Sequence, residues 1–302
     1  MQSIWLIIQL LIFLFVGFSI AHKIPYPLKT FAFKILPYFS YILLITIAIE
    51  FSQVLHQIDR PLQILSNALI LSVATSGGTL LCCYFIFKRM GYQPSNGKVS
   101  ADLFIKSLFN IGYTFLALFF GYGLAEFCHS FEYALHVNSW NLLLIFMFLI
   151  GLDLAYSPLD RSWLNWNMIL VPIGCIIGSI LGALLTRLVI QDISLQNLIM
   201  LSQGYGFYSM SGIVITELKD AELGSIALMN DLFREILAIL CMYVIGWRYP
   251  RAAISCAGAT AMDATLPMVR QACGNNFIPH AIVSGFILSI LAPIAVSILA
   301  VL

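Results

Sequence analysis

Long apolar segments separated by short polar ones occupy most of the chain. About eight of them reach the ~20 residues that a helix needs to cross a bilayer. Their expected bounds are 1–21, 35–54, 64–87, 103–124, 140–157, 168–190, 223–245 and 278–302. The first segment lacks a basic leading region and a small-residue cleavage site, so we interpret it as a spanning helix. The pattern predicts an all-α polytopic membrane protein.

Two further stretches, 197–219 and 252–274, are moderately apolar and are interrupted by glycine, serine, threonine and proline. Glycine permits non-helical backbone, and proline removes a helical hydrogen bond. Irregular backbone at membrane depth is tolerated only where protein buries it or where it lines a cavity. We therefore predict two re-entrant segments whose tips meet near the midplane, where free helix ends can bind ions.

Lys and Arg residues near helix ends indicate orientation, because they stay on the cytoplasmic side. If the N-terminus lies outside, eleven of the fifteen fall on that side. These eleven are Lys23, Lys29, Lys34, Lys88, Arg89, Lys98, Lys106, Arg161, Arg248, Arg251 and Arg270. The outer side receives Arg60, Arg187 and Lys219. The sequence thus predicts N-out and C-out, with each re-entrant segment returning to the side from which it enters.

Short matches at constant spacing indicate internal repeats. Residues 17–21 resemble 121–125 at an offset of 104, and residues 48–51 resemble 151–154 at an offset of 103. Each unit contains three spans, an odd number, so the second unit enters the membrane from the opposite face. The repeat is therefore predicted to be inverted.

The repeats suggest how the chain is organised. We predict a scaffold at 1–192, made of repeats 1–100 and 101–192. Residues 193–302 form the predicted substrate-binding unit, in which each broken stretch precedes one full helix. A weaker match at a spacing of about 52 residues relates the two halves of this unit.

The helix expected at 223–245 carries Asn230, Asp231, Arg234 and Glu235 at its centre. An ionisable group at mid-membrane costs roughly 2.5–3.5 kcal/mol on insertion scales, so three of them must face protein or water. Their spacing places them on one helical face. A buried ion pair that only fixes helix packing would account for Arg234 and one carboxylate. The second acid is then available for function.

Composition excludes several classes of protein. Apolar and aromatic residues make up 61% of the chain and charged residues 10%, against about 25% charged in soluble proteins. A net charge of +1 gives no reason to expect nucleic acid. The cysteines and histidines show no ligand spacing, so no metal site is expected. No P-loop, Rossmann fingerprint or G-x-S-x-G motif occurs, so we predict no cofactor and no familiar hydrolase.

Several motifs follow one another in the last third of the chain. They are Gly204-Tyr205-Gly206-Phe207-Tyr208-Ser209-Met210-Ser211-Gly212-Ile213 with Glu217, Asn230-Asp231-Leu232, Arg234-Glu235, Cys256-Ala257-Gly258-Ala259-Thr260, Met262-Asp263, Thr265-Leu266-Pro267 and Gly285-Phe286-Ile287-Leu288-Ser289. This set resembles the bacterial lysine exporter family, the LysO-like inner-membrane proteins. The similarity is dense from about residue 200 and mostly hydropathic before it.

The resemblance implies a multi-pass protein of the bacterial inner (plasma) membrane that is not an enzyme. It implies export of L-lysine and toxic lysine analogues from the cytoplasm in exchange for protons. The expected partners are therefore L-lysine, protons and the lipid bilayer.

A cationic amino acid presents one carboxylate and two ammonium groups, so its site should combine hydrogen-bond donors with at least two carboxylates. We expect backbone amides of the broken stretches to bind the substrate carboxylate, and Asp263 with Glu217 or Asp231 to bind ammonium groups. The predicted substrate-binding residues are Tyr208, Ser209, Ser211, Glu217, Asn230, Asp231, Asp263 and Thr265. Asp231, Glu235 and Asp263 are candidates for proton coupling, and Arg234 for an ion pair.

Two alternatives stay open. A cation/proton antiporter, or an exporter of another small solute, would use the same carboxylates. An intramembrane enzyme or receptor would use the acids for catalysis or ligand binding. Glu50 and Asp153 occupy equivalent repeat positions toward helix ends. For these two residues, contact with interfacial water explains the sequence as well as a function does.

Overall fold

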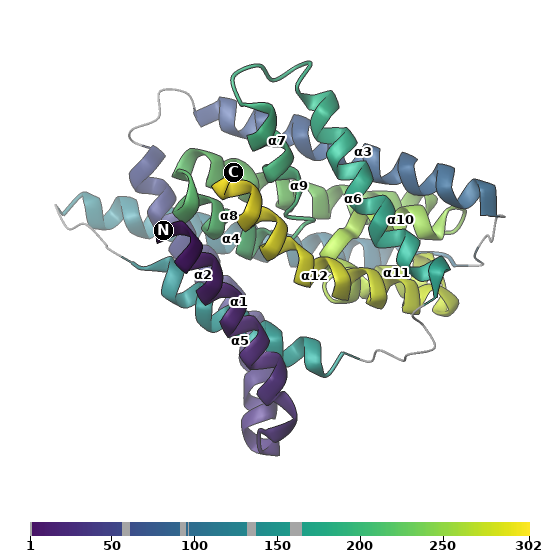
Figure 1. The fold of residues 1–302 in the computed structure, drawn as a ribbon, viewed down its shortest axis with the longest axis horizontal. Helices are drawn as coiled ribbons and strands as arrows, with labels where there is room; N and C mark the ends of the chain where they lie inside the picture. Colours follow the sequence, from purple (N-terminus) through teal and green to yellow (C-terminus); the bar gives the residue numbers. More distant parts are fainter. Residues whose placement is uncertain (1, 56–60, 91–94, 96, 132–136, 158–164) are drawn as a thin grey trace.

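The computed structural model describes residues 2–55, 61–90, 95, 97–131, 137–157 and 165–302, which form helices joined by turns (Figure 1). The long helices are α1 (Gln2–Ile20), α2 (Tyr26–Leu55), α3 (Pro61–Met90), α4 (Ala101–His129), α5 (Ser139–Ala155), α6 (Trp166–Thr186), α9 (Ala221–Ile245) and α12 (Ile278–Val301). The shorter elements are α7 (Leu195–Ser202), α8 (Tyr208–Leu218), α10 (Pro250–Ala257), η3 (Gly258–Met262) and α11 (Leu266–Ala272). Arg60 and Arg161, which entered the orientation count, lie outside the described residues.

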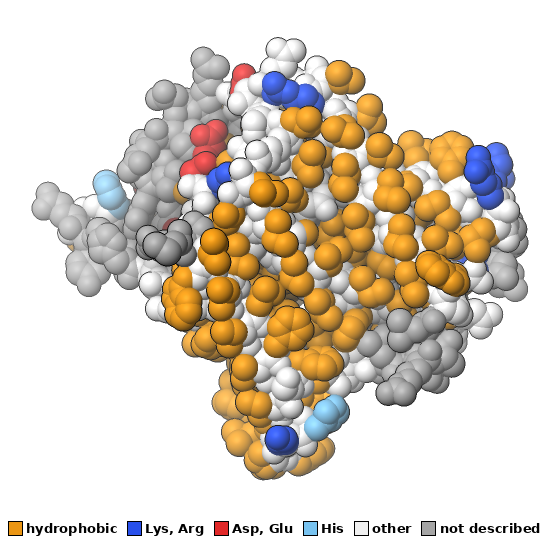
Figure 2. All heavy atoms as spheres, in the orientation of Figure 1, with side chains coloured by type: hydrophobic (Ala, Val, Ile, Leu, Met, Phe, Trp, Pro, Cys, Tyr) orange, Lys and Arg blue, Asp and Glu red, His pale blue; other side chains and the backbone are white. Residues whose placement is uncertain are grey.

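Six described helices, α1, α2, α3, α4, α6 and α12, are long and apolar enough to cross a membrane. Helix α9 is also long enough, but it carries three charged residues near its centre. Large apolar side chains are exposed along these helices, for example Phe119 and Leu116 on α4. Figure 2 shows one such face, which is mostly hydrophobic, with most Lys and Arg side chains near its edges. The prediction of an all-α polytopic membrane protein is confirmed.

Polar residues at the ends of apolar segments determine where several helices begin. In the described part of the chain, five helices start after a residue whose side chain accepts a hydrogen bond from the amide three positions later. These capping residues are Ser100, Asn138, Asn165, Ser194 and Asp220. Each satisfies an amide that the helix itself leaves without a partner.

The helices form two groups in space (Figure 1). Helices α1, α2, α4 and α5 pack on one another and are called the four-helix group here. Helices α3 and α6 pack together and also contact α7, α9, α10 and α12, so they belong with the C-terminal elements in the broken-helix group. The proposed boundary at residue 192 therefore follows the order of the sequence, whereas the packing separates α3 and α6 from the rest of the scaffold.

Glycines allow backbone contact between α3 and α6. A Cβ added to Gly178 would lie 2.4 Å from the Cα of Thr79, and one added to Gly182 would lie 2.5 Å from the Cα of Thr75. Real side chains do not tolerate such distances, so the two helix axes can approach this closely only with glycine. Gly174, Gly178 and Gly182 of α6 repeat a G-x-x-x-G spacing, which thus has a packing role.

Glycines also allow backbone contact between helices of the four-helix group. A Cβ on Gly17 of α1 would lie 2.2 Å from the carbonyl oxygen of Phe148 in α5. One on Gly121 of α4 would lie 2.5 Å from the carbonyl oxygen of Ile45 in α2. Helices α1 and α5, and likewise α2 and α4, are therefore held in backbone contact.

Replacing Gly178 by alanine should destabilise the protein, because overpacking a tight contact costs typically ~1–3 kcal/mol. We expect Gly178→Ala to lower the melting temperature of the purified protein in detergent by several degrees. Gly77 is the matched control, since a Cβ there meets no heavy atom within 4 Å. Equal melting temperatures for Gly178→Ala and Gly77→Ala would contradict the close α3–α6 contact.

Candidate functional site

The two broken segments cross at their interruptions. The first is α7 followed by α8, and the second is α10, η3 and α11. The Ala259 amide donates a hydrogen bond to the Tyr205 carbonyl at 2.9 Å. Tyr205, Gly206 and Gly258 have φ angles of 51°, 85° and 61°, and a Cβ on Gly258 would lie 2.2 Å from the Tyr205 oxygen. The second segment can reach the first only with glycine at this position.

Asp231 of α9 forms hydrogen bonds with the interruption of the first broken segment. Its carboxylate accepts hydrogen bonds from the Gly206 amide at 3.0 Å and from the Ser211 hydroxyl at 2.6 Å. The Asn230 side chain donates to it at 3.3 Å. A Cβ on Gly204 would lie 1.9 Å from an Asp231 oxygen, so glycine leaves room for the carboxylate. The negative charge also lies near the start of α8, where a helix dipole favours it.

Two other α9 side chains satisfy the end of α7. Asn230 donates to the Leu201 carbonyl at 3.2 Å, and Arg234 donates to the Ser202 carbonyl at 3.3 Å. These carbonyls have no partner within their own helix because α7 ends there. A positive charge at a helix C-terminus is favoured by the dipole. Asn230 and Arg234 therefore cap the C-terminus of α7, while Asp231 binds the backbone that leads into α8.

Arg234 is fully buried and uses neutral partners. Besides Ser202, its guanidinium donates to Ser179 at 2.9 Å and to the Cys175 sulfur at 3.2 Å. Among the described residues, none of its hydrogen bonds goes to Asp231 or Glu235. The structure thus gives Arg234 a capping role. Arg234 also lies within electrostatic range of Asp231, and an ion pair between the two stays a prediction.

A cavity of about 570 Å³ lies between the two helix groups, next to the crossing. Its polar and aromatic lining comes from both groups and comprises Phe33, Ser40, Tyr41, Ser107, Asn110, Thr114, Phe146, Asp153, Phe207, Tyr208, Ser209, Glu235, Thr260, Asp263 and Ser289. Within the described part of the chain, Asp153, Glu235 and Asp263 are its only charged lining residues. The cavity is therefore acidic.

The carboxylates around the cavity are poorly compensated. Glu235 is 5% exposed, and its Oε2 atom has no hydrogen-bond partner among the described residues. Asp263 accepts a hydrogen bond from the Ala264 amide at 2.5 Å and lies within electrostatic range of Asp153 and Glu235. Burying a carboxylate such as that of Glu235 without a counter-charge is costly, whereas Asp153 is half-buried and Asp263 is exposed. A cation or a proton is the complement that this cavity requires.

The start of α8 adds unused hydrogen-bond donors. Phe207 precedes this helix and provides no side-chain cap. The amides of Tyr208 and Ser209 make no hydrogen bond within the part of the chain that the structure describes. Both residues line the cavity. The free N-terminus of α8 therefore offers a place for an anionic group beside the three acids.

The structure divides the predicted site residues into two sets. Tyr208, Ser209, Glu235 and Asp263 line the cavity. Ser211, Asn230 and Asp231 lie behind it and hold the interruption. The buried Thr265 donates to the Thr260 carbonyl at 3.0 Å, and Glu217 is exposed at the end of α8, so neither lines the cavity.

Several lining residues were not among the predicted site residues. Asn110 and Thr114 lie one turn apart on α4, and Tyr41 lies on α2. Lone polar residues inside apolar spans are the signal that would have indicated them. Asp153, to which the sequence assigned no role, faces the cavity from α5.

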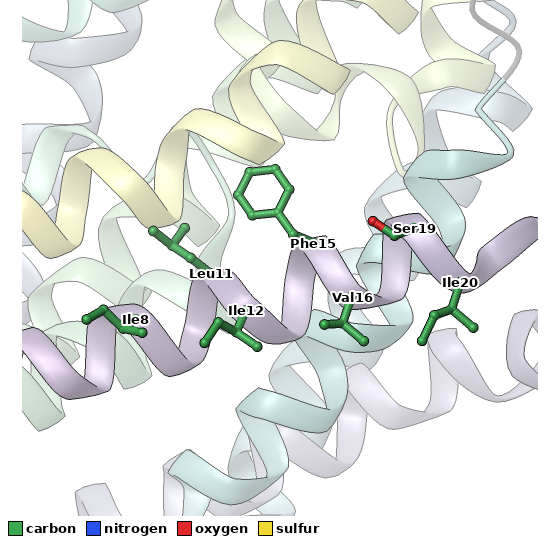
Figure 3. Close-up of a pocket in the computed structure, with 7 residues that line it drawn as sticks. All are labelled: Ile8, Leu11, Ile12, Phe15, Val16, Ser19 and Ile20. Carbon is green, nitrogen blue, oxygen red and sulfur yellow. The ribbon is translucent and has the colours of Figure 1, made fainter.

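A second hollow of about 450 Å³ runs along the outer surface of α1 (Figure 3). Its lining residues are Ile8, Leu11, Ile12, Phe15, Val16, Ser19 and Ile20. Most of these side chains are apolar and exposed on the surface of a candidate spanning helix. This hollow suits lipid chains and has no group that would bind a charged solute.

Residues 115–300 match the family described as Lysine exporter LysO. The chain belongs to this family. The matched region includes Asp153, Glu235 and Asp263, whereas the α2 wall of the cavity lies outside it. Family membership favours a transporter over an enzyme, and it confirms the resemblance found in the sequence.

Two curated proteins are similar to this chain. An Escherichia coli (strain K12) protein named Lysine exporter LysO is 34% identical over 168 residues, which are 55% of this chain and 56% of that protein. A Haemophilus influenzae protein named Putative lysine exporter is 29% identical over 180 residues, which are 59% of this chain and 92% of that protein. The chain thus covers little more than half of the length of the Escherichia coli relative. No solved structure matches the chain.

Removing the Asp231 carboxylate should destabilise the fold. Asp231→Ala leaves the Gly206 amide and the Ser211 hydroxyl without an acceptor, and each unsatisfied buried donor costs about 1–3 kcal/mol. We expect a clearly lower melting temperature in detergent, whereas the exposed Glu222 at the start of the same helix tolerates alanine.

The double variant distinguishes capping from ion pairing. Adding Arg234→Ala to Asp231→Ala should destabilise the protein further, because the end of α7 then loses its cap as well. Recovery of stability in the double variant would instead identify the two residues as ion-pair partners.

Proposed function

We propose that this protein is a secondary transporter of the bacterial inner membrane that exports L-lysine, and that the acidic cavity is its substrate site. The observation that carries the proposal is a cavity between two helix groups with three carboxylates and no basic side chain among its described lining residues. Membership in a family of lysine exporters supports a cationic amino acid as the substrate. A volume of about 570 Å³ is within the usual range for small-molecule sites.

Lysine would match the cavity group by group. The free amides at the start of α8 would bind the α-carboxylate, as helix N-termini bind anions. Asp263 and Glu235 would bind the ammonium groups through charge-assisted hydrogen bonds. The aromatic rings of Tyr41 and Phe146 would pack on the aliphatic stem. The uncapped helix start favours an amino acid over a bare metal cation, which has no carboxylate to bind there.

The position of the cavity suggests which side it serves. It lies between the first halves of α2 and α4 and the second half of α5. These helix ends are near Lys29, Lys34 and Lys106, which the positive-inside rule assigns to the cytoplasm. In this proposal, N-out and C-out orientation holds and the described state accepts lysine from the cytoplasm.

The inverted repeat is part of the proposal, and the glycine contacts support it. Gly17 and Gly121 are 104 residues apart, and Ile45 and Phe148 are 103 apart. Swapping the two repeats therefore converts the contact of Gly17 with Phe148 into that of Gly121 with Ile45, and the reverse. This relation is what a two-fold axis between units 1–100 and 101–192 produces.

The contact between α3 and α6 follows the same rule. Gly78 contacts Gly178, and Gly182 contacts Thr75. Gly78 and Gly182 are 104 residues apart, and Thr75 and Gly178 are 103 apart. Inverted repeats in transporters commonly place substrate at the repeat interface beside discontinuous helices. We propose that the two broken segments are such helices, re-entrant from opposite faces.

Proton exchange would account for the surplus of acid. Lysine carries a net charge of +1, whereas three carboxylates face the cavity. Export of a cation from a cell that is negative inside works against roughly 2.3 kcal/mol per 100 mV. After lysine leaves, a proton would bind the vacated carboxylate. The protonated, empty site could then return to the cytoplasmic side, and the proton would compensate the charge that lysine carries out. Glu235, with an oxygen that no described residue binds, is the best placed for this exchange.

Neutralising either central acid should abolish transport without unfolding the protein. We expect Asp263→Asn and Glu235→Gln to reduce counterflow of labelled lysine in proteoliposomes at least tenfold. Their melting temperatures should not fall, because Glu235→Gln removes an uncompensated buried charge and Asp263→Asn replaces an exposed carboxylate by an amide of the same size. Glu222→Gln, which changes an exposed carboxylate on α9, is the matched control.

Lysine counterflow that persists in both variants would exclude these acids as substrate ligands. Sodium-dependent fluxes without lysine counterflow in the unaltered protein would instead identify a cation/proton antiporter.

Lysine movement should drive protons in the opposite direction. The measurement is the internal pH of proteoliposomes while lysine moves down its gradient and the membrane potential is clamped at zero. We expect protons to enter the compartment that lysine leaves. Lysine movement without a proton flux would show a uniporter, in which the surplus carboxylates only hold the cation.

A further inference from the structure

Glu50 and Asp153 occupy equivalent positions in the two repeats but have different environments. Asp153, near the end of α5, faces the cavity. Glu50, near the end of α2, accepts hydrogen bonds from Ser139, one from its amide at 3.1 Å and one from its hydroxyl at 2.6 Å. Ser139 is the first residue of α5. One carboxylate is therefore available to a solute, and its counterpart joins α2 to α5.

The surrounding walls differ in the same way. Phe146 and Ile150 of α5 line the cavity. Their counterparts 103 residues earlier, Leu43 and Ile47 of α2, are packed in the core with exposed fractions of 0% and 6%. One repeat-related face is thus hollow and the other is closed. The glycine backbone contacts follow the two-fold relation between the repeats. The side chains that line the cavity, where the two helix groups meet, do not.

We propose that Glu50 and Asp153 are two alternating substrate ligands of the transporter, an inference that rests on the proposed function. In the described state, Asp153 binds the cation on the cytoplasmic side while Glu50 is held by Ser139. In the opposite state, α2 and α5 separate at Ser139, and Glu50 lines the outward-facing cavity beside Leu43 and Ile47. Asp153 is then enclosed between the same helices at their other end.

This exchange preserves the charge of the site. Glu235 and Asp263 lie by the crossing of the broken segments, which both states share. Asp153 is the third carboxylate in one state and Glu50 in the other. Three carboxylates therefore face the substrate on either side, and the same complement of lysine and proton satisfies both states. Glu217, at the end of α8, lies within electrostatic range of Glu50 and would add acidity on the exit side.

Side-specific kinetics test the assignment. Lysine counterflow is measured in inside-out and right-side-out vesicles, with the lysine concentration varied on one side at a time. We expect Asp153→Asn to raise the apparent KM at the cytoplasmic face at least tenfold and to change that at the external face less than twofold. Glu50→Gln should have the reverse effect, and Asp153→Glu should restore the cytoplasmic KM.

A control variant separates the loss of the carboxylate from the loss of its hydrogen bond. Ser139→Ala releases Glu50 without removing its charge, so the external KM should not rise. An increase in external KM as large as that of Glu50→Gln would overturn the ligand role of Glu50. Equal changes at both faces for Asp153→Asn, or no change at either, would overturn that of Asp153.

Thiol labelling tests the exchange without relying on lysine. Single cysteines are placed at Ile150 and Ile47 in a background without the seven native cysteines, and are treated with a membrane-impermeant maleimide. Ile150→Cys should react from the cytoplasmic face. Ile47→Cys should react slowly and only from the external face, and Ser139→Ala should accelerate that reaction several-fold.

The two readouts distinguish the possible failures. If the unaltered protein shows no lysine counterflow, the proposed function is wrong, yet the labelling pattern still decides whether the two faces open alternately. If Ser139→Ala leaves labelling of Ile47→Cys unchanged, the Glu50–Ser139 contact does not close the outer side, and the alternating role is wrong.

Discussion

The hydrogen bonds between Asp231 and the interruption of the first broken segment are the constraint on which the site depends. An interrupted helix leaves amides and carbonyls without partners, and the interior of a bilayer offers them none. Asp231 accepts from Gly206 and Ser211, while Asn230 and Arg234 donate to the last carbonyls of α7. One helix, α9, therefore supplies partners on both sides of the gap. Because these groups are satisfied by protein, the start of α8 can remain uncapped beside the cavity.

Hydropathy predicted most of the helices closely, although α2 begins at Tyr26, well before the expected start at residue 35. The expected spans 168–190 and 223–245 correspond to α6 at Trp166–Thr186 and α9 at Ala221–Ile245. Glycine likewise marked the first broken segment, and glycine with proline marked the second. These features are local, because the length of an apolar run and the position of a helix breaker do not depend on distant contacts.

The roles of the acids could not be predicted in the same way. Asp231 and Glu235 lie one helical turn apart, yet one binds the backbone of the interruption and the other faces the cavity. That difference depends on where α7 and α8 cross α9, which is a tertiary feature. The association of α3 and α6 with the broken-helix group is another, since the G-x-x-x-G spacing of α6 indicates close packing but not which elements lie against it. Asn110 and Thr114 were visible as isolated polar residues, but only the packing of α4 reveals what they face.

The two helix groups give the cavity its character. Residues of α2, α4 and α5 form one wall, and the broken segments with α9 and α12 form the other. A solute bound there touches both groups at once, so its binding energy depends on their relative position. Ligands that join two bodies in this way favour the arrangement in which both sets of contacts are made.

The glycine contacts of α3 and α6 also bear on how such a protein can diversify. Gly78, Gly178 and Gly182 bring two backbones together so closely that no single replacement fits without moving a helix. The cavity wall is built from side chains, several of them at positions where a change alters only the shape or polarity of the hollow. A descendant lineage can therefore acquire a new cargo by successive substitutions in the wall. The α3–α6 junction offers no comparable series of viable intermediates, and we expect it to outlast changes in what the protein carries.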